Sequence, residues 1–420
     1  MATPNTLHFI REEYIMSMVV KNNMSAISTL NTLNKNSSAL ASSLKKVSSG
    51  MKINSAADDA SGYAISERMR SSTVDILKTL KEKVINAAND TNTDSDRATI
   101  QKELDQSIDQ INDNANVTYN GKYLVDGSHN SKVTATTTAM TNESLGSNTT
   151  SDTLFCDMTD RNGNSLNIQG SDTITMSVVK EGKTETFSAY GSEKLDDLVK
   201  KSNALKSGAD ISSGSTIGSD VAGDTVNTAD GGNAITIHAA GTGVTNQISG
   251  LTFSVTNTKG QVQKSANAVL DNFSETIRAQ NKSDDNAISL QVGTKANQSI
   301  RVGLTDMRAE ALGLQSSTGA TIQIGTQEKA NAAINVLDNA VQKALDQQTT
   351  IGSVESRLSY TSSNLTTASE NVQASESTIR DADMAKEMTE YTKNNVLLQA
   401  AQSMLAQANQ SSSSVLSLLQ

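Results

Sequence analysis

Apolar residues recur near both ends of the chain at the spacings that one face of an α-helix requires. Near the N-terminus, alternating steps of four and three join Ala26, Leu30, Leu33, Ser37, Leu40, Leu44, Val47 and Met51. Near the C-terminus, steps of seven join Met384, Tyr391, Leu398 and Leu405. Such repeats form the seam of a coiled coil. The only proline in the sequence is Pro4, so nothing after it removes a backbone donor, and long uninterrupted helices are predicted at both ends.

The region between the two seams, residues 129–290, lacks this helical period. Short alternating runs such as DTITMSVV, NAITIHAA and LTFSVTN are separated there by Gly, Asn, Asp and Ser, which predicts strands joined by turns. A helix is also expected around residues 100–115, and a hairpin in TYNGKYLVDGS, where Asn-Gly and Asp-Gly flank apolar residues. We therefore predict an α+β multidomain protein. It is mainly α at both termini, with long paired coiled-coil helices, and has a β-rich central domain.

Composition and motifs exclude several classes of function. The net charge of −10 disfavours nucleic-acid binding, which needs a clustered positive surface. No apolar run reaches the ~18 residues that a membrane-spanning helix needs. The sequence has three His, one Cys and no Trp, and it lacks the motifs of metallopeptidases, serine hydrolases and phosphate-binding loops. We therefore predict a protein that is not an enzyme, and we assign it no catalytic, cofactor-binding or metal-binding residues.

The segment SSGMKINSAADDASGYAISERMR combines two aspartates with Ser, Tyr and Arg, as an active site would. Gly50 can adopt a positive φ and so end the first seam helix. Asn54 or Ser55 can cap the next helix, and Asp58 and Asp59 then lie in its first turn, where the helix dipole favours negative charge. Because adjacent residues of a helix point about 100° apart, the two carboxylates do not converge. We interpret Gly50, Asn54, Asp58 and Asp59 as a bend between helices.

Two narrow seams separated by a β-rich domain can bury their apolar edges against each other, which brings the ends of the chain together. Flanks of Ala, Ser and Val stay uncovered, and residues 394–420 contain no charged residue. An uncharged apolar tail of this kind is a liability in a lone molecule, so self-assembly is predicted. The side chains expected to carry assembly are Leu30, Leu33, Leu40, Leu44, Val47, Met384, Tyr391, Leu398, Leu405, Leu416 and Leu419.

Four long runs of the sequence begin NNMSAISTLNTLN, ANDTNTDSDRATI, LTDMRAEALGL and SESTIRDADMAKE. In order and position they resemble bacterial flagellin, the subunit of the flagellar filament. The resemblance implies that the terminal helices pair to form the inner tube of a helical homopolymer, while the central domain projects outwards. It also implies secretion through the flagellar type III export apparatus to an extracellular flagellum. The implied partners are an export chaperone, the filament cap and hook-associated proteins, with no nucleic acid and no membrane.

Two other functions stay open at the level of sequence. A hook–filament junction protein or another minor flagellar component shares the terminal helices, and the central domain can carry an adhesin or an enzyme activity. The resemblance further implies recognition by host innate immune receptors. The segment that one receptor reads corresponds to Thr79, Lys81 and Glu82, with Thr79 in place of the usual arginine. The leucines that cytosolic sensors read correspond to Leu416, Leu418 and Leu419.

The resemblance also sets the expected boundaries. Family members begin close to MVVKNN, and residues 11–13 can be encoded by AGG-GAG-GAA, a ribosome-binding sequence, so Met16 or Met18 is expected to be the true start. After Arg70, roughly 25 to 30 residues of helix are missing, about 40 Å at 1.5 Å per residue. The predicted segments are an N-terminal extension 1–17, an N-terminal inner-tube helix 18–50, a shortened outer-layer segment 51–128, a variable β-rich domain 129–290, a C-terminal strand and outer-layer helix 291–380, and a C-terminal inner-tube helix 381–420.

Overall fold

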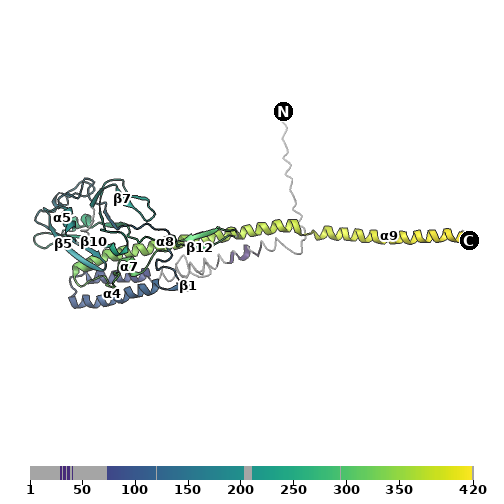
Figure 1. Ribbon diagram of the computed structural model, residues 1–420, viewed down its shortest axis with the longest axis horizontal. Coiled ribbons are helices and arrows are strands. Elements are labelled where there is room, and N and C mark those ends of the chain that lie inside the picture. The colour runs from purple at the N-terminus through teal and green to yellow at the C-terminus, as the bar shows by residue number, and fades with distance from the viewer. Residues whose placement is uncertain are drawn as a thin grey trace, which may run out of the picture. The chain divides into compact units, whose positions relative to one another are not determined.

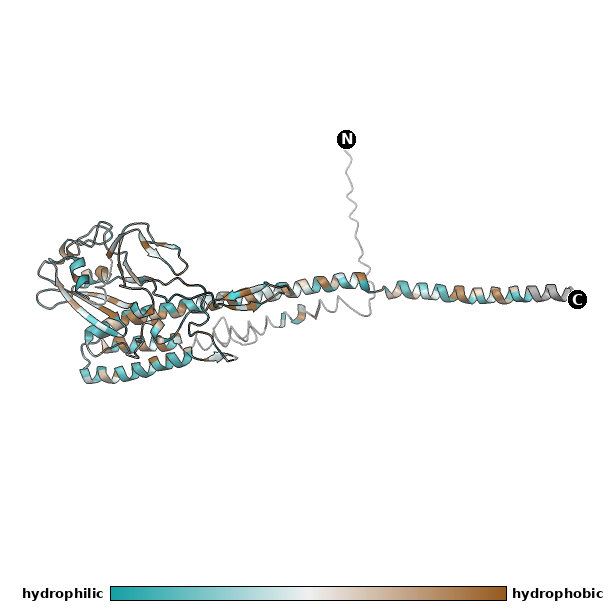
Figure 2. Ribbon diagram, viewed as in Figure 1, coloured by the Kyte–Doolittle hydropathy of each residue, from teal (hydrophilic) through white to brown (hydrophobic). Residues whose placement is uncertain are grey.

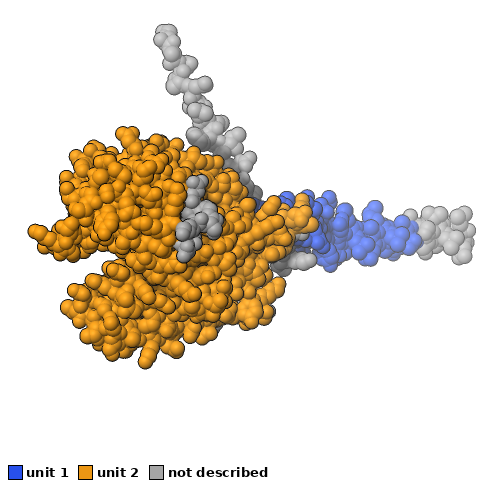
Figure 3. All heavy atoms as spheres, turned by 60° about the vertical axis from the view of Figure 1, so that its left-hand side comes forward, with its two compact units in different colours: residues 1–54, 360–420 blue, residues 55–359 orange. Residues whose placement is uncertain are grey.

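The computed structural model describes residues 29–30, 32–34, 36–37, 40, 73–119, 121–202, 211–293 and 295–418 (Figure 1). The chain divides into two compact units (Figure 3). Unit 1 is Met1–Asn54 with Tyr360–Gln420, and unit 2 is Ser55–Ser359. Several predicted features lie outside the described residues: the extension 1–17, the bend residues Gly50, Asn54, Asp58 and Asp59, and the seam residues Leu44, Val47 and Leu419.

The helical part of unit 2 consists of α3 (Val74–Ala87), α4 (Asp94–Ala115), the short α7 (Ala309–Leu312) and the first part of α8 (Gln327–Arg380). Each long helix buries residues at the three- and four-residue spacing of one helical face. One core cluster therefore joins the three helices. Its members include Leu77, Leu80 and Val84 of α3, Leu104, Ile108 and Ile111 of α4, and Val336, Leu337 and Ala340 of α8.

Two short hairpins accompany these helices. β1 (Thr118–Tyr119) pairs antiparallel with β2 (Lys122–Tyr123), inside the segment for which the sequence predicts a hairpin. Gly121 lies in the turn between them with a φ of 77°, which glycine adopts readily because it has no Cβ. β12 (Ile288–Gln291) pairs antiparallel with β13 (Ser299–Val302). Ile300 and Val302 of β13 are buried in the helical core cluster.

The middle domain, which we define as residues 133–283, is built from antiparallel sheets. The three-stranded sheet has the order β10-β4-β5, from β4 (Thr173–Lys180), β5 (Lys183–Tyr190) and β10 (Ile248–Thr256). The four-stranded sheet has the order β11-β3-β9-β6, from β3 (Ala139–Asn142), β6 (Ile211–Gly214), β9 (Ala234–His238) and β11 (Ser274–Ile277). The smaller elements are β7 (Thr216–Ser219), β8 (Thr225–Asn227), α5 (Leu195–Lys201), α6 (Lys264–Leu270) and the 3-10 turns η2 (Phe155–Asp157) and η3 (Val244–Asn246).

The middle domain has its own core. Alternate residues of β4 point inward, as a half-buried strand requires, and Ile174, Met176 and Val178 are fully buried. The rings of Phe253 and Phe273 pack with their centroids 5.1 Å apart. Leucines from α5 and α6 complete this second cluster.

The chain enters and leaves the middle domain through two segments that lie side by side. The amide of Val133 donates to the carbonyl of Ser283 at 3.0 Å, and the amide of Ser283 donates to the carbonyl of Val133 at 3.1 Å. Thr136 and Gln280 pair in the same antiparallel manner. The domain is therefore an insertion whose two ends lie close together.

In unit 1, the described residues between 29 and 40 are helical, and α9 (Met384–Leu418) follows α8 after a short break. The Asp383 carboxylate caps α9, because it accepts a hydrogen bond from the amide of Ala385 at 3.0 Å. The predicted fold class is confirmed: helices occupy the terminal regions and a β-rich domain lies between them.

Candidate functional site

The helix α9 presents the predicted C-terminal seam to solvent. Met384, Tyr391, Leu398 and Leu405 are 40%, 65%, 57% and 64% exposed. Seven residues advance an α-helix by nearly two full turns, so these side chains follow one another along one face. Figure 2 shows apolar residues recurring between polar ones along the coloured part of α9. Leu416 lies in the last turn of the same helix.

The described part of the N-terminal seam is exposed in the same way. Leu30, Leu33 and Leu40 are 57%, 63% and 71% exposed, and each lies in helical backbone. A leucine exposed to this degree forgoes most of the roughly 1.5 to 3 kcal/mol that its burial would contribute. The structure therefore leaves the described seam residues of both ends available for further contacts.

The two units differ in whether their described apolar side chains are buried or exposed. Unit 2 buries most of its described large aliphatic residues in clusters made from residues 74–351. In unit 1, the described apolar residues of α9 are exposed, and the polar groups beside them after Lys393 are all uncharged. An apolar surface of this extent, without like charges to repel a second copy, is characteristic of an association surface.

The predicted receptor segment lies on α3. Thr79 and Glu82 are exposed, and the Thr79 hydroxyl donates to the carbonyl of Asp75 one turn earlier, at 2.9 Å. Lys81 instead forms an ion pair with Asp338 of α8. The three residues therefore share a helix, but Lys81 is also engaged in holding two helices together.

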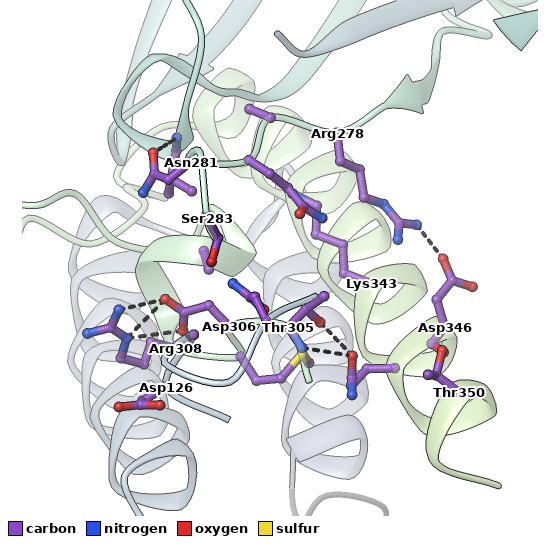
Figure 4. Close-up of a pocket in the computed structure, with 18 of the residues that line it drawn as sticks. Asp126, Arg278, Asn281, Ser283, Thr305, Asp306, Arg308, Lys343, Asp346 and Thr350 are labelled. Atoms are coloured by element: carbon purple, nitrogen blue, oxygen red, sulfur yellow. Dashed lines mark hydrogen bonds and ion pairs between the residues drawn. The ribbon is translucent and has the colours of Figure 1, made fainter. Parts of the chain in front are cut away.

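A polar cleft of about 300 Å³ opens in unit 2 between the segment after β11, the segment before α7, and α8 (Figure 4). Four of its charged side chains form two ion pairs: Arg278 with Asp346 at 2.6 Å, and Arg308 with Asp306 at 2.6 Å. The Asp306 carboxylate accepts hydrogen bonds from Arg308 and so raises the pKa of that guanidinium. Gln347 accepts a hydrogen bond from the hydroxyl of Thr305 at 2.5 Å. The Arg278–Asp346 pair joins the segment after β11 to α8, and the Thr305–Gln347 bond joins the segment before α7 to α8.

Sequence reasoning missed this polar cleft. The available signal was a break in the apolar stripe of α8, where Lys343, Asp346 and Gln347 occupy positions close to buried alanines. Among the described residues, no cluster of three or more His, Cys, Asp or Glu side chains is arranged to hold a metal ion. Within the same part of the chain, no helix is both long and apolar enough to cross a bilayer.

The long terminal helices, the inserted β domain and the exposed seams define a helical subunit built for association with copies of itself. Comparison with known proteins identifies the family to which this subunit belongs. The model of the bacterial flagellin C-terminal helical region matches residues 334–419, and that of the N-terminal helical region matches residues 20–74 and 71–130. The chain belongs to the bacterial flagellin family, as its resemblance to flagellin implied.

Two relatives match over nearly the whole chain, and a third matches over a shorter part. A flagellin from Clostridium tyrobutyricum is 30% identical, with 94% of this chain and 99% of the relative covered. A flagellin from Bacillus subtilis strain 168 is 28% identical, with 96% and 100% covered. The flagellar filament 33 kDa core protein of Treponema phagedenis is 47% identical over 129 residues, which are 30% of this chain and 45% of that protein.

The predicted loss of helix after Arg70 stays a prediction. The family model aligns in two segments, residues 20–74 and 71–130, rather than in one continuous run. The two segments overlap at residues 71–74. The expected missing helix, roughly 25 to 30 residues or about 40 Å at 1.5 Å per residue, would lie beside this overlap.

Proposed function

We propose that the chain is the structural subunit of a bacterial flagellar filament and that it polymerises through its two terminal helices. The observation that carries the proposal is the exposed seam of α9. The described apolar side chains of this helix are exposed to solvent in the single subunit. A contact between different surfaces of neighbouring copies that does not close into a ring produces a fibre.

Assembly in this proposal is driven by burial of the seams. Leu30, Leu33, Leu40 and Leu44 with Val47 supply one edge, and Met384, Tyr391, Leu398, Leu405, Leu416 and Leu419 supply the other. Each leucine contributes roughly 1.5 to 3 kcal/mol on burial, and every subunit repeats the contribution. Segments 18–50 and 381–420 then form the inner tube, segments 51–128 and 291–380 the outer layer, and residues 129–290 the exterior.

The proposed location is the extracellular flagellum, reached through the flagellar type III export apparatus. The proposed partners are other copies of the chain, an export chaperone, the filament cap and hook-associated proteins. Host innate immune receptors are further proposed partners, with exposed Thr79 and Glu82 on α3 as contacts. Each pairing can be tested by co-purification of the full chain with the purified partner.

The direct test is Leu405→Asp. A carboxylate at a buried position of every subunit must be desolvated without a partner, so filaments should be absent at concentrations at which the unchanged chain polymerises. Val262→Asp is the matched control, because Val262 is also an exposed apolar side chain, at 53%, but lies in the middle domain. Electron microscopy and sedimentation measure the outcome. Normal filaments from Leu405→Asp would refute the proposal.

A further inference from the structure

Within unit 2, the helix α8 has one buried face and a second face that is buried at its start and exposed further along. The first face carries Ala333, Leu337, Ala340, Ala344 and Ile351, which belong to the core cluster shared with α3 and α4. The second face lies one residue, or about 100°, around the helix. At alternating steps of four and three it carries Ala332, Val336, Asn339, Lys343, Asp346 and Thr350. In a helical bundle such a second stripe would receive another helix.

The middle domain occupies the apolar end of this second face. Gly250 of β10 lies so close to α8 that a Cβ added there would be 2.7 Å from Cγ2 of Val336 and 3.2 Å from the carbonyl oxygen of Ala332. The ladder between β10 and β4 shifts register between Ile248 and Gly250, which is where the strand approaches the helix. One helical turn later, Nδ2 of Asn339 donates to the carbonyl of Ser249 at 3.0 Å.

The polar end of the second face also contacts the middle domain. The Lys343 ammonium lies 3.4 Å from a carboxylate oxygen of Glu275 and 3.4 Å from Oε1 of Gln247. The side chains of Lys343 and Glu275 are 10% and 3% exposed. Arg278 then pairs with Asp346 at 2.6 Å at the rim of the cleft (Figure 4). Lys343 and Glu275 are buried deeply enough to need each other, because either charge alone would be left desolvated and uncompensated.

The residues at the start of β10 also contact the short helix α7. Nε2 of Gln247 donates to the carbonyl of Glu310 at 2.7 Å. Gly313, whose φ is 83°, closes α7 so near to the strand that an added Cβ would be 2.5 Å from Oγ of Ser249. Val179 of β4 is buried in the same core cluster as the three long helices, so the apolar packing is continuous between the sheet and the helical layer.

We infer that the second face of α8 is an obligatory docking surface for the chain's own middle domain, which occupies the position of a further helix in the bundle. Without the domain, Val336 would meet water and Lys343 would lose its contacts with Glu275 and Gln247. Asn339 would lose its bond to Ser249, and Asp346 its ion pair with Arg278. The middle domain is then part of the framework that keeps α8 folded, and not a module that is merely joined to it through two connecting segments. The inference concerns the single subunit and does not rest on the proposed polymerisation.

The test is Gly250→Val in the full chain, with Gly214→Val as the matched control. Both glycines lie in strands of the middle domain without a positive φ, but a Cβ at position 214 would have its nearest neighbour 4.0 Å away. Amide hydrogen exchange of dilute, unassembled protein is measured along α8. Exchange within residues 332–347 should be at least about tenfold faster in Gly250→Val and about unchanged in Gly214→Val. Unchanged exchange in Gly250→Val would overturn the inference.

A double-mutant cycle keeps the inference testable if Gly250→Val does not fold. Gly250→Ala places only the Cβ against Val336, and Val336→Ala removes the methyl group that it would meet. The combined variant should therefore lose less exchange protection in α8 than the sum of the two single changes. Strictly additive losses would show that the strand and the helix do not depend on each other, and would overturn the inference. Polymerisation of the same variants is a separate readout, so the two proposals can fail independently.

Discussion

At the scale of single residues, burial of Asp271 after α6 changes its protonation. Burial raises the pKa of its carboxyl from 3.8 to about 6, although the carboxylate accepts a hydrogen bond from the amide of Phe253 at 2.6 Å. Between pH 3.8 and about pH 6, this carboxyl is therefore protonated in the folded chain and ionised in the unfolded chain. The resulting stabilisation is fully present below pH 3.8 and is lost as the pH rises to about 6.

Asp271→Asn should flatten this dependence, because the amide oxygen still accepts the Phe253 bond but no longer titrates. At pH 7 we expect the variant to have the higher free energy of unfolding, by on the order of 1 to 3 kcal/mol. Urea denaturation followed by circular dichroism across that pH range measures it. Asp284→Asn, at an exposed position, is the control. An unaltered pH profile in Asp271→Asn would contradict the expectation.

The position and exposure of a single residue can be predicted from the sequence where they follow from a local pattern. The exposed seam leucines of α9 follow from a spacing of seven and need no knowledge of the fold. Residues that act across the chain cannot be found in this way. Lys81 and Asp338 are 257 positions apart, and nothing local to Gly250 indicates that it must approach Val336.

At the scale of elements, the start of α4 is fixed by a capping box. The amide of Asp96 donates to the Thr93 hydroxyl at 3.3 Å, and the Asp96 carboxylate accepts from the Thr93 amide at 3.0 Å. Thr93→Ala removes the first of these bonds, so the free energy of unfolding should fall by about 1 kcal/mol. Thermal unfolding measures the change, with Thr91→Ala at an exposed position as control. Equal stability of the two variants would show that the cap is dispensable.

The helix α4 also shows how much of the secondary structure local sequence patterns can predict. The polar run before residue 97 predicted capping oxygens, and α4 begins there, at Asp94, a few residues before the predicted apolar stripe. The runs DTITMSVV, NAITIHAA and LTFSVTN all contain strands, as predicted. Their order does not follow from the sequence, because β10 pairs with β4 and β9 lies between β3 and β6. Such pairing is decided by packing between distant segments, which one sequence does not reveal.

At the scale of the whole molecule, stability and association should reside in different units. The described core clusters use residues between Val74 and Ile351, and α9 contributes none of its described side chains to them. Removal of α9 should therefore abolish association between subunits without lowering the stability of unit 2. This separation is expected of a subunit that must be a stable monomer before it polymerises.

A chain that ends at Arg380 tests the separation directly. Its thermal midpoint should lie within about 4 °C of the full-length value, equivalent to about 1 kcal/mol, while sedimentation should detect no polymer. Full-length Leu405→Asp is the control, because it should lose polymerisation by a single side-chain change and keep the same midpoint. If shortening the chain instead abolished the cooperative unfolding transition, α9 would belong to the fold of unit 2. If the shortened chain still formed long polymers, the seam of α9 would not be the surface that joins the subunits.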